Sequence, residues 1–150
     1  MPNAPHIVYV EDNPTDARLF TRAVEAVAPG TRVRWLRDGQ DAIDVIESLT
    51  DPAYLLPAVV IIDIKLGRVG GFEVLRYVRE GEATSAVPVV MMTSSTQESD
   101  IERAYAGGVN SFISKPATYG ELKTLASNFI PYWLEHNQRV LAFSGVPNRP

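Results

Sequence analysis

The sequence predicts one α/β domain built on a five-stranded parallel sheet, and three observations lead to this prediction. Short apolar runs alternate with segments of helical pattern five times along the chain. The run Ala58–Ile62 is apolar at every position, which is typical of a strand buried on both faces of a parallel sheet. The segments between the runs are long enough for crossover helices, so we expect helices on both faces of the sheet.

Composition limits the kind of protein. With 150 residues, 45% of them hydrophobic, the chain can form one domain with a sizeable core. The net charge of −4 and the lack of a basic stripe argue against a nucleic-acid partner, and the absence of cysteine excludes disulfides and thiolate metal sites. No apolar run approaches the roughly 20 residues of a membrane span, and residues 1–5 do not resemble a signal peptide. We therefore expect a cytoplasmic protein with no membrane partner.

The apolar runs place the strands and the domain boundaries. The five runs are His6–Val10, Arg32–Leu36, Ala58–Ile62, Val87–Met92 and Val109–Ile113. No internal repeat and no linker to a second domain interrupts them. The pattern therefore predicts a single domain over residues 6–135, with an N-terminal tail at 1–5 and a C-terminal extension at 136–150. Within that extension, residues 144–150 should be a loose tail.

The first two helices have clear start and stop signals. Asn13 should cap the first helix, with Pro14 as its first helical residue and Asp16 favourable near its positive end. Pro29-Gly30 should stop this helix. Asp38 can cap the second helix.

The later helices differ in strength. A third helix should follow Gly70-Gly71. The fourth, about Glu98–Ala106, has the weakest apolar face and is therefore a natural candidate for a moving part. The last helix opens with a good match to a capping box, formed by Thr118 and Glu121. Pro131 should kink or end it, because proline removes a backbone donor and clashes one turn back.

The carboxyl ends of four expected strands carry polar residues. In an open α/β sheet these ends share one edge, and ligands bind just beyond it. The residues are Glu11 and Asp12 after the first strand, Asp63 after the third, Thr93 and Ser94 at the end of the fourth, and Lys115 with Pro116 after the fifth. Taken singly, each has a simpler interpretation as a helix cap, a turn residue or a surface lysine. Together they indicate that three acids, a hydroxyl and a lysine converge.

The charges of this set indicate its chemistry. Clustered carboxylates raise each other's pKa unless a cation lies among them. Oxygen ligands with no Cys or His nearby favour Mg²⁺, with Mn²⁺ as a substitute. An aspartate can attack phosphorus and form an aspartyl-phosphate, while a lysine and a hydroxyl suit the remaining phosphoryl oxygens. The set therefore predicts an aspartate that takes a phosphoryl group in the presence of magnesium.

This ordered set resembles the receiver domain of two-component response regulators, which has a flavodoxin-like, doubly wound (βα)5 fold. The resemblance covers about residues 6–135. It implies that Asp63 is the phosphoacceptor, that Asp12 binds Mg²⁺ directly and that Glu11 acts through water. It also implies that Lys65, two residues after the acceptor, offers its backbone carbonyl to the metal.

The same resemblance assigns the switch residues. It implies that Thr93 is the hydroxyl that bonds the phosphoryl group and that Phe112 is a rotating aromatic, although Phe112 is also expected to be partly core. Lys115 resembles the lysine that contacts a phosphoryl oxygen, before a proline that is often cis. One departure is Gly67, which stands where receivers usually have a proline and should loosen the loop. Another is the bulky cation of Lys65 beside the metal site.

A narrower resemblance concerns stand-alone regulators that partner bacterial phytochrome kinases. It rests on the run Glu-Asp-Asn-Pro-Thr-Asp at 11–16, on Thr93–Ser95 and on the long last helix. Such relatives often dimerise through the fourth and fifth helices and the last strand. The aromatic-rich cluster of Tyr132, Trp133 and Leu134 is therefore expected at a dimer interface, with coverage of the core as the alternative.

We therefore expect a single-domain response regulator, not an enzyme, that receives its phosphoryl group from a sensor histidine kinase, with a bacteriophytochrome as the candidate. A relay shuttle or phosphate sink that passes the group to a histidine phosphotransfer protein would use the same residues. A flavin carrier would need a phosphate-cradling loop where Glu11-Asp12 stand. An aspartate-nucleophile phosphatase would need a second aspartate where Lys65 stands. His6 and His136, which have no metal-binding companions, are expected to be structural or solvent-facing.

Overall fold

Five strands and five α-helices alternate along residues 6–145, the part of the chain that the computed structural model describes. The strands are β1 (His6–Val10), β2 (Arg32–Leu36), β3 (Val59–Ile62), β4 (Val89–Thr93) and β5 (Ser111–Ser114). The helices are α1 (Pro14–Val27), α2 (Gly39–Ser48), α3 (Gly71–Glu80), α4 (Glu98–Ala106) and α5 (Tyr119–Pro131). The expected tail at 1–5 and most of the one at 144–150 lie outside the described residues.

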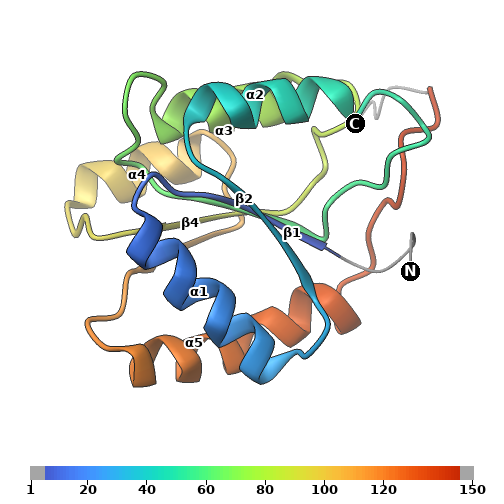
Figure 1. Ribbon diagram of the computed structural model, residues 1–150. Helices are drawn as coiled ribbons and strands as arrows, with labels where there is room; N and C mark the ends of the chain where they lie inside the picture. The colour runs from blue at the N-terminus through green and yellow to red at the C-terminus, as the bar shows by residue number, and fades with distance from the viewer. Residues whose placement is uncertain (1–5, 146–150) are drawn as a thin grey trace.

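The strands form one parallel sheet in the order β2-β1-β3-β4-β5. Helices α1 and α5 lie on one face of the sheet, and α2, α3 and α4 lie on the other (Figure 1). This doubly wound arrangement confirms the predicted flavodoxin-like fold. It also brings the carboxyl ends of all five strands to one edge.

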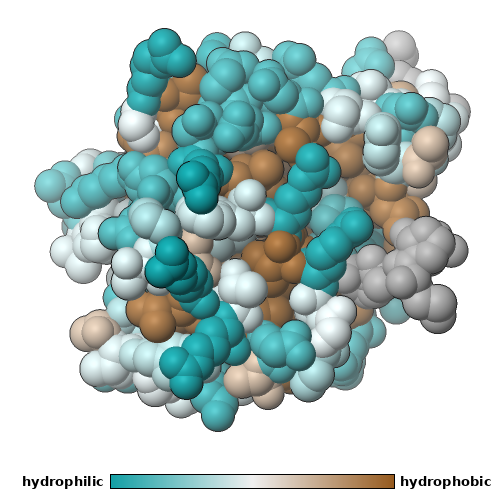
Figure 2. Space-filling model, viewed as in Figure 1, coloured by the Kyte–Doolittle hydropathy of each residue, from teal (hydrophilic) through white to brown (hydrophobic). Residues whose placement is uncertain are grey.

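The sheet separates two apolar layers. In β1, Ile7 and Tyr9 pack toward α1 and α5, while Val8 and Val10 pack toward α2, α3 and α4. Strands β1, β3 and β4 are buried at every position, as expected for strands covered on both faces. The edge strand β2 instead exposes Arg32 and Arg34. On the face drawn in Figure 2, hydrophilic side chains break up the apolar surface, which suits an exposed sheet edge.

Three strands begin later than their apolar runs, β3 by one residue and β4 and β5 by two. Val87 and Val109 are buried, as their place in the runs requires, but β4 starts at Val89 and β5 at Ser111. Pro88 has no N–H for the ladder. The Asn110 side chain then accepts a hydrogen bond from the Val89 N–H at 2.8 Å and replaces a backbone partner. A side-chain contact therefore precedes the ladder between β4 and β5.

The predicted helix caps form with one difference. The side chains of Asn13, Asp38 and Thr118 accept hydrogen bonds from backbone N–H groups in the first turns of α1, α2 and α5. The capping box of α5 is incomplete, because the Glu121 carboxylate accepts from the N–H of Ala117 and not from that of Thr118. At the other end, α5 stops at Pro131, as predicted, and a π-helical turn, η1 (Tyr132–His136), continues its path.

Residues 137–145 run from the α5 side of the sheet past the amino ends of the strands to the α2 side (Figure 1). The Leu141 carbonyl accepts a hydrogen bond from the Leu56 N–H at 2.8 Å, and Phe143 packs against the layer of α2 and α3. Nearby His6 is 5% exposed. Burial and the surrounding arginines lower the pKa of His6 to about 4, so it is neutral at pH 7. None of the described helices combines the length and the apolar character that a membrane crossing requires.

Arg79 ties α3 to the loops that precede β4 and β5. Its half-buried guanidinium donates four hydrogen bonds, and burial lowers its pKa. Because three acceptors are main-chain carbonyls, one side chain satisfies part-buried groups from two loops. The acceptors are Gly108 O at 2.8 Å, Ser85 O at 3.1 Å, Val87 O at 2.7 Å and Asn110 Oδ1 at 3.0 Å.

We expect Arg79→Ala to lower the free energy of unfolding by about 2–4 kcal/mol, because it leaves several carbonyls without partners. Arg76→Ala is the matched control, since Arg76 is exposed on the same helix beside Tyr77. The control should change stability by no more than about 0.5 kcal/mol. Urea unfolding of both variants measures the difference, and equal losses would contradict the role given to Arg79.

Candidate functional site

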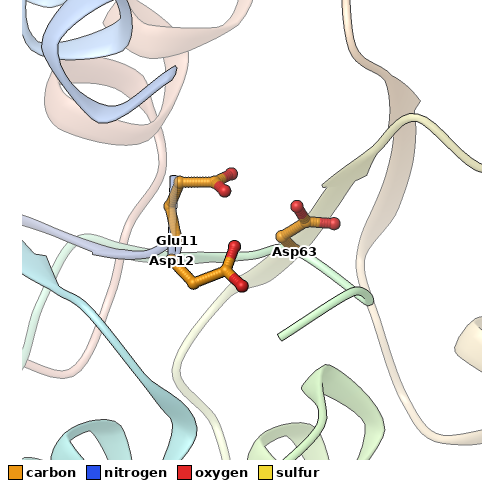
Figure 3. A group of neighbouring side chains, drawn as sticks. All are labelled: Glu11, Asp12 and Asp63. Carbon is orange, nitrogen blue, oxygen red and sulfur yellow. The ribbon is translucent and has the colours of Figure 1, made fainter. Parts of the chain in front are cut away.

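The carboxyl edge of the sheet brings together three acids. Glu11 and Asp12 follow β1 and Asp63 follows β3, and one carboxylate oxygen from each lies within 4.8 Å of the others (Figure 3). Glu11 and Asp63 are 1% and 4% exposed, while Asp12 is exposed. The strand pairing fixes these positions. The Glu11 N–H donates to Leu36 O at 3.0 Å, and the Asp63 N–H donates to Val10 O at 3.1 Å.

Lys115 lies among these acids. Its backbone N–H donates to Thr93 O at 2.9 Å and extends the pairing of β4 with β5. Its Nζ lies 2.7 Å from Glu11 Oε2, 2.8 Å from Asp63 Oδ2 and 2.9 Å from Asp16 Oδ2. Within residues 6–145, these three contacts are all the ion pairs that form. The structure thus brings together the predicted acids and lysine.

Asp16 belongs to this cluster, although the sequence analysis placed it only as a favourable charge near the start of α1. It does lie in the first turn of that helix, and its side chain also reaches Lys115. A further unpredicted contact is the Tyr9 hydroxyl, which donates to Glu11 Oε2 at 3.3 Å. One feature of the sequence could have indicated the contact of Asp16 with Lys115. Asp16 stands five residues after Glu11, in the first turn of the helix that begins at the carboxyl edge of the sheet.

Burial and charge pairing set the electrostatics of the cluster. Burial raises the pKa of Glu11, and hydrogen bonds from Lys115 and from the Asn13 N–H only partly offset this effect. Burial alone would lower the pKa of Lys115. Hydrogen bonds to Asp63, Glu11 and Asp16 outweigh burial and hold the Lys115 pKa above its ordinary value. Lys115 is therefore charged at neutral pH and stabilises the ionised carboxylates around it.

The three acids also fit a hard cation. Carboxylate oxygens are the ligands that Mg²⁺ and Mn²⁺ prefer, and no Cys or His belongs to the described cluster. Mg²⁺ usually keeps several waters and takes only one or two carboxylates directly. The combination of two buried acids with the exposed Asp12 suits such a partly hydrated ion.

The loop between β3 and α3 holds the Asp63 carboxylate. The Lys65 N–H donates to Asp63 Oδ1 at 3.2 Å, while the Lys65 side chain is exposed. Gly71 packs so closely that a Cβ there would overlap the Asp63 carbonyl oxygen and the Ile64 Cα. Gly67, by contrast, has open space around it and no positive φ. Packing therefore requires glycine at Gly71 and does not require it at Gly67.

Thr93 is fully buried at the end of β4 and is linked to α4 by Ser95. The Thr93 Oγ1 accepts a hydrogen bond from the Ser95 N–H at 3.3 Å. The Ser95 hydroxyl donates to Asp100 Oδ2 in α4 and accepts from the Gln97 N–H at 3.3 Å. Gln97, the N-cap residue of α4, provides no side-chain cap, so the contacts of Ser95 are the side-chain link between the end of β4 and the start of α4.

The other predicted residues lie outside the acid cluster. Phe112 is half-buried against the layer of α2, α3 and α4. Trp133 and Leu134 are half-buried against the layer of α1 and α5. Tyr132 is 49% exposed, and its ring meets the Trp133 ring edge-on, with 5.0 Å between the ring centroids. The peptide bond before Pro116 is trans, whereas the resemblance indicated that cis is frequent there.

Comparison with known proteins identifies the family. The model of the response regulator receiver domain matches residues 7–127, and the chain belongs to this family. It is 39% identical over 132 residues to the probable methanogenesis regulatory protein FilR2 of Methanothrix harundinacea. That alignment covers 88% of this chain and 85% of FilR2. The prediction of a receiver domain is therefore confirmed.

Two solved structures support the prediction that the chain is a response regulator of the stand-alone type. The phosphorylated cyanobacterial phytochrome response regulator RcpA is 27% identical, with a TM-score of 0.79, and the match covers 92% of this chain and 98% of RcpA. The Mn²⁺-bound form of response regulator Rcp1 is 25% identical, also with a TM-score of 0.79. This match covers 91% of the present chain and 99% of Rcp1. The chain is thus similar over nearly its full length to two response regulators, one of which, RcpA, is a phytochrome response regulator.

We expect Gly71→Ala to lower the free energy of unfolding by about 1–3 kcal/mol, because the new methyl group overlaps the Asp63 backbone. The matched control is Gly70→Ala, since Gly70 has a φ of −78° and nothing within 4 Å of the added Cβ. Thermal unfolding and the backbone NMR shifts of Asp63 check both effects. A Gly70 variant as unstable as the Gly71 variant would show that the contact with Asp63 is not the cause.

Proposed function

We propose that the protein is a single-domain response regulator whose Asp63 accepts a phosphoryl group from the phosphohistidine of a sensor histidine kinase. The observation that carries this proposal is the meeting of Asp63 with Lys115, Glu11 and Asp12 at the carboxyl edge of the sheet. Membership of the receiver family supports it. The relay shuttle that the sequence left open uses the same residues, and no contact within 6–145 favours it.

In the proposed reaction, an Asp63 carboxylate oxygen attacks the phosphorus of the donor. The new O–P bond forms while the N–P bond to the kinase histidine breaks, and the histidine nitrogen keeps the electron pair. Lys115 already lies 2.8 Å from Asp63, so its ammonium can stabilise charge on the phosphoryl oxygens. The Thr93 hydroxyl provides a second donor once it turns from Ser95.

Glu11, Asp12 and Asp63 would hold the divalent cation, together with the backbone carbonyl of Lys65. When bound, the ion supplies positive charge for the phosphoryl oxygens and offsets repulsion between the acids. The donor set favours Mg²⁺, and the Mn²⁺-bound state of the similar regulator Rcp1 supports a divalent ion at this place.

A kinase of the phytochrome type is the proposed donor, because the chain is similar to a phosphorylated phytochrome response regulator over nearly its full length. The regulator would pass the signal on through a change in how it binds its partners. We propose that Thr93 and Phe112 act as the switch and that α4, β5 and α5 form the responding surface. Helix α4 is suited to move, because it buries only Ala104 fully.

We expect intact mass spectrometry to find one phosphoryl group on the wild-type protein after incubation with acetyl phosphate and Mg²⁺. Asp63→Asn should carry none, and EDTA should abolish labelling of the wild type. Asp12→Ala should be labelled at least about tenfold more slowly, since it removes a metal ligand. Asp44→Ala, an exposed acid in α2, is the matched control and should react like the wild type. Undiminished labelling in EDTA or in Asp63→Asn would contradict the proposed site.

We also propose a homodimer through α4, β5 and α5, with Tyr132, Trp133 and Leu134 at its edge. Tyr132 is the member that the fold leaves exposed, and buried aromatic rings often dominate binding at interfaces. We expect Tyr132→Ala to weaken dimerisation by about tenfold or more in sedimentation experiments. Tyr54→Ala is the control, because Tyr54 is similarly exposed in the loop between α2 and β3. A monomeric wild type at high concentration would refute the dimer.

A further inference from the structure

The Lys115 ammonium has three N–H donors and three carboxylate partners. Glu11, Asp16 and Asp63 each take one contact, at 2.7–2.9 Å. No donor is left for a phosphoryl oxygen. Under the proposed function, on which this inference rests, Lys115 must therefore give up one partner when Asp63 gains a phosphoryl group.

The three partners differ in how easily they can release Lys115. The Glu11 side chain is 1% exposed, so loss of Lys115 would leave a buried charge without its main partner. Asp63 itself carries the phosphoryl group. The Asp16 side chain is 38% exposed, so water can solvate its carboxylate when Lys115 leaves. Asp16 is thus the partner whose loss costs the least.

We infer that Asp16 is a positioning residue that holds Lys115 in a resting place and competes with the incoming phosphoryl group for its third donor. Asp16 does not touch the reacting atoms and acts only through Lys115. Its place in the first turn of α1 fixes the carboxylate beside the cluster, because the Asn13 cap holds its backbone N–H at 3.2 Å. Removing the charge should therefore make Lys115 more available.

We expect Asp16→Asn to react with acetyl phosphate about two- to fivefold faster than the wild type, which is the range for loss of a partly exposed ion pair. The test uses Mg²⁺ at saturation and follows intact mass over time. Asp41→Asn is the matched control. Asp41 also follows its N-cap by three residues, in the first turn of α2, and is exposed. It therefore reproduces the loss of a favourable charge at a helix start without any contact to Lys115.

A second measurement does not depend on phosphorylation. Hydrogen exchange of the Lys115 ammonium protons, followed by NMR on lysine-labelled protein without a phosphodonor, should be faster in Asp16→Asn and unchanged in Asp41→Asn. Equal exchange in all three proteins, or a labelling rate in Asp16→Asn at or below that of the wild type, would overturn the inference. If the wild type takes no phosphoryl group while the exchange difference is present, the proposed function fails and the contact between Asp16 and Lys115 stands.

Discussion

The carboxyl edge of this sheet depends on the single ammonium of Lys115. Two of its partners, Glu11 and Asp63, are almost fully buried, and unpaired carboxylates at such positions would oppose folding by several kcal/mol. The lysine follows β5 while the acids follow β1 and β3. The charges therefore meet only if the strands are parallel and end level with one another. The topology places the charges, and the neutralised charges allow these strand ends to stay buried.

Two further constraints hold the geometry around this ion cluster. The close contact of Gly71 with the Asp63 backbone fixes the loop that carries the proposed acceptor. On the opposite side, Thr93 bonds to Ser95, and Ser95 bonds to Asp100 near the start of α4. In the proposed switch, a Thr93 hydroxyl that turns toward a phosphoryl group would lose its bond to Ser95. The N-cap residue of α4, Gln97, makes no side-chain cap of its own, and the helix buries only Ala104 fully. The contacts through Ser95 therefore link the end of β4 to the least anchored helix.

The sequence predicted the fold well because its signals are local and repeated. Apolar runs and helix signals located every strand and α-helix, while the flavodoxin-like arrangement of the strands was implied by the resemblance to receiver domains. The starts of β4 and β5 were missed, because Pro88 and the Asn110 side chain alter the first ladder contacts. Asp16 was missed for a different reason. An acid in the first turn of a helix already has a sufficient local explanation, so nothing in the sequence required its contact with Lys115, which lies 99 positions along the chain.

The arrangement around Lys115 also explains how one small domain can have two states of similar free energy. A change of state in the proposed cycle exchanges one charged partner of Lys115 for another. The exchange at Lys115 leaves no buried charge unpaired, because the partner that is released, Asp16, reaches water. The difference between the states is then a difference between contacts of the same kind, which is small enough for a single phosphoryl group to reverse. A cluster made only of buried acids would lack this property, since every exchange would leave an uncompensated charge in the protein interior.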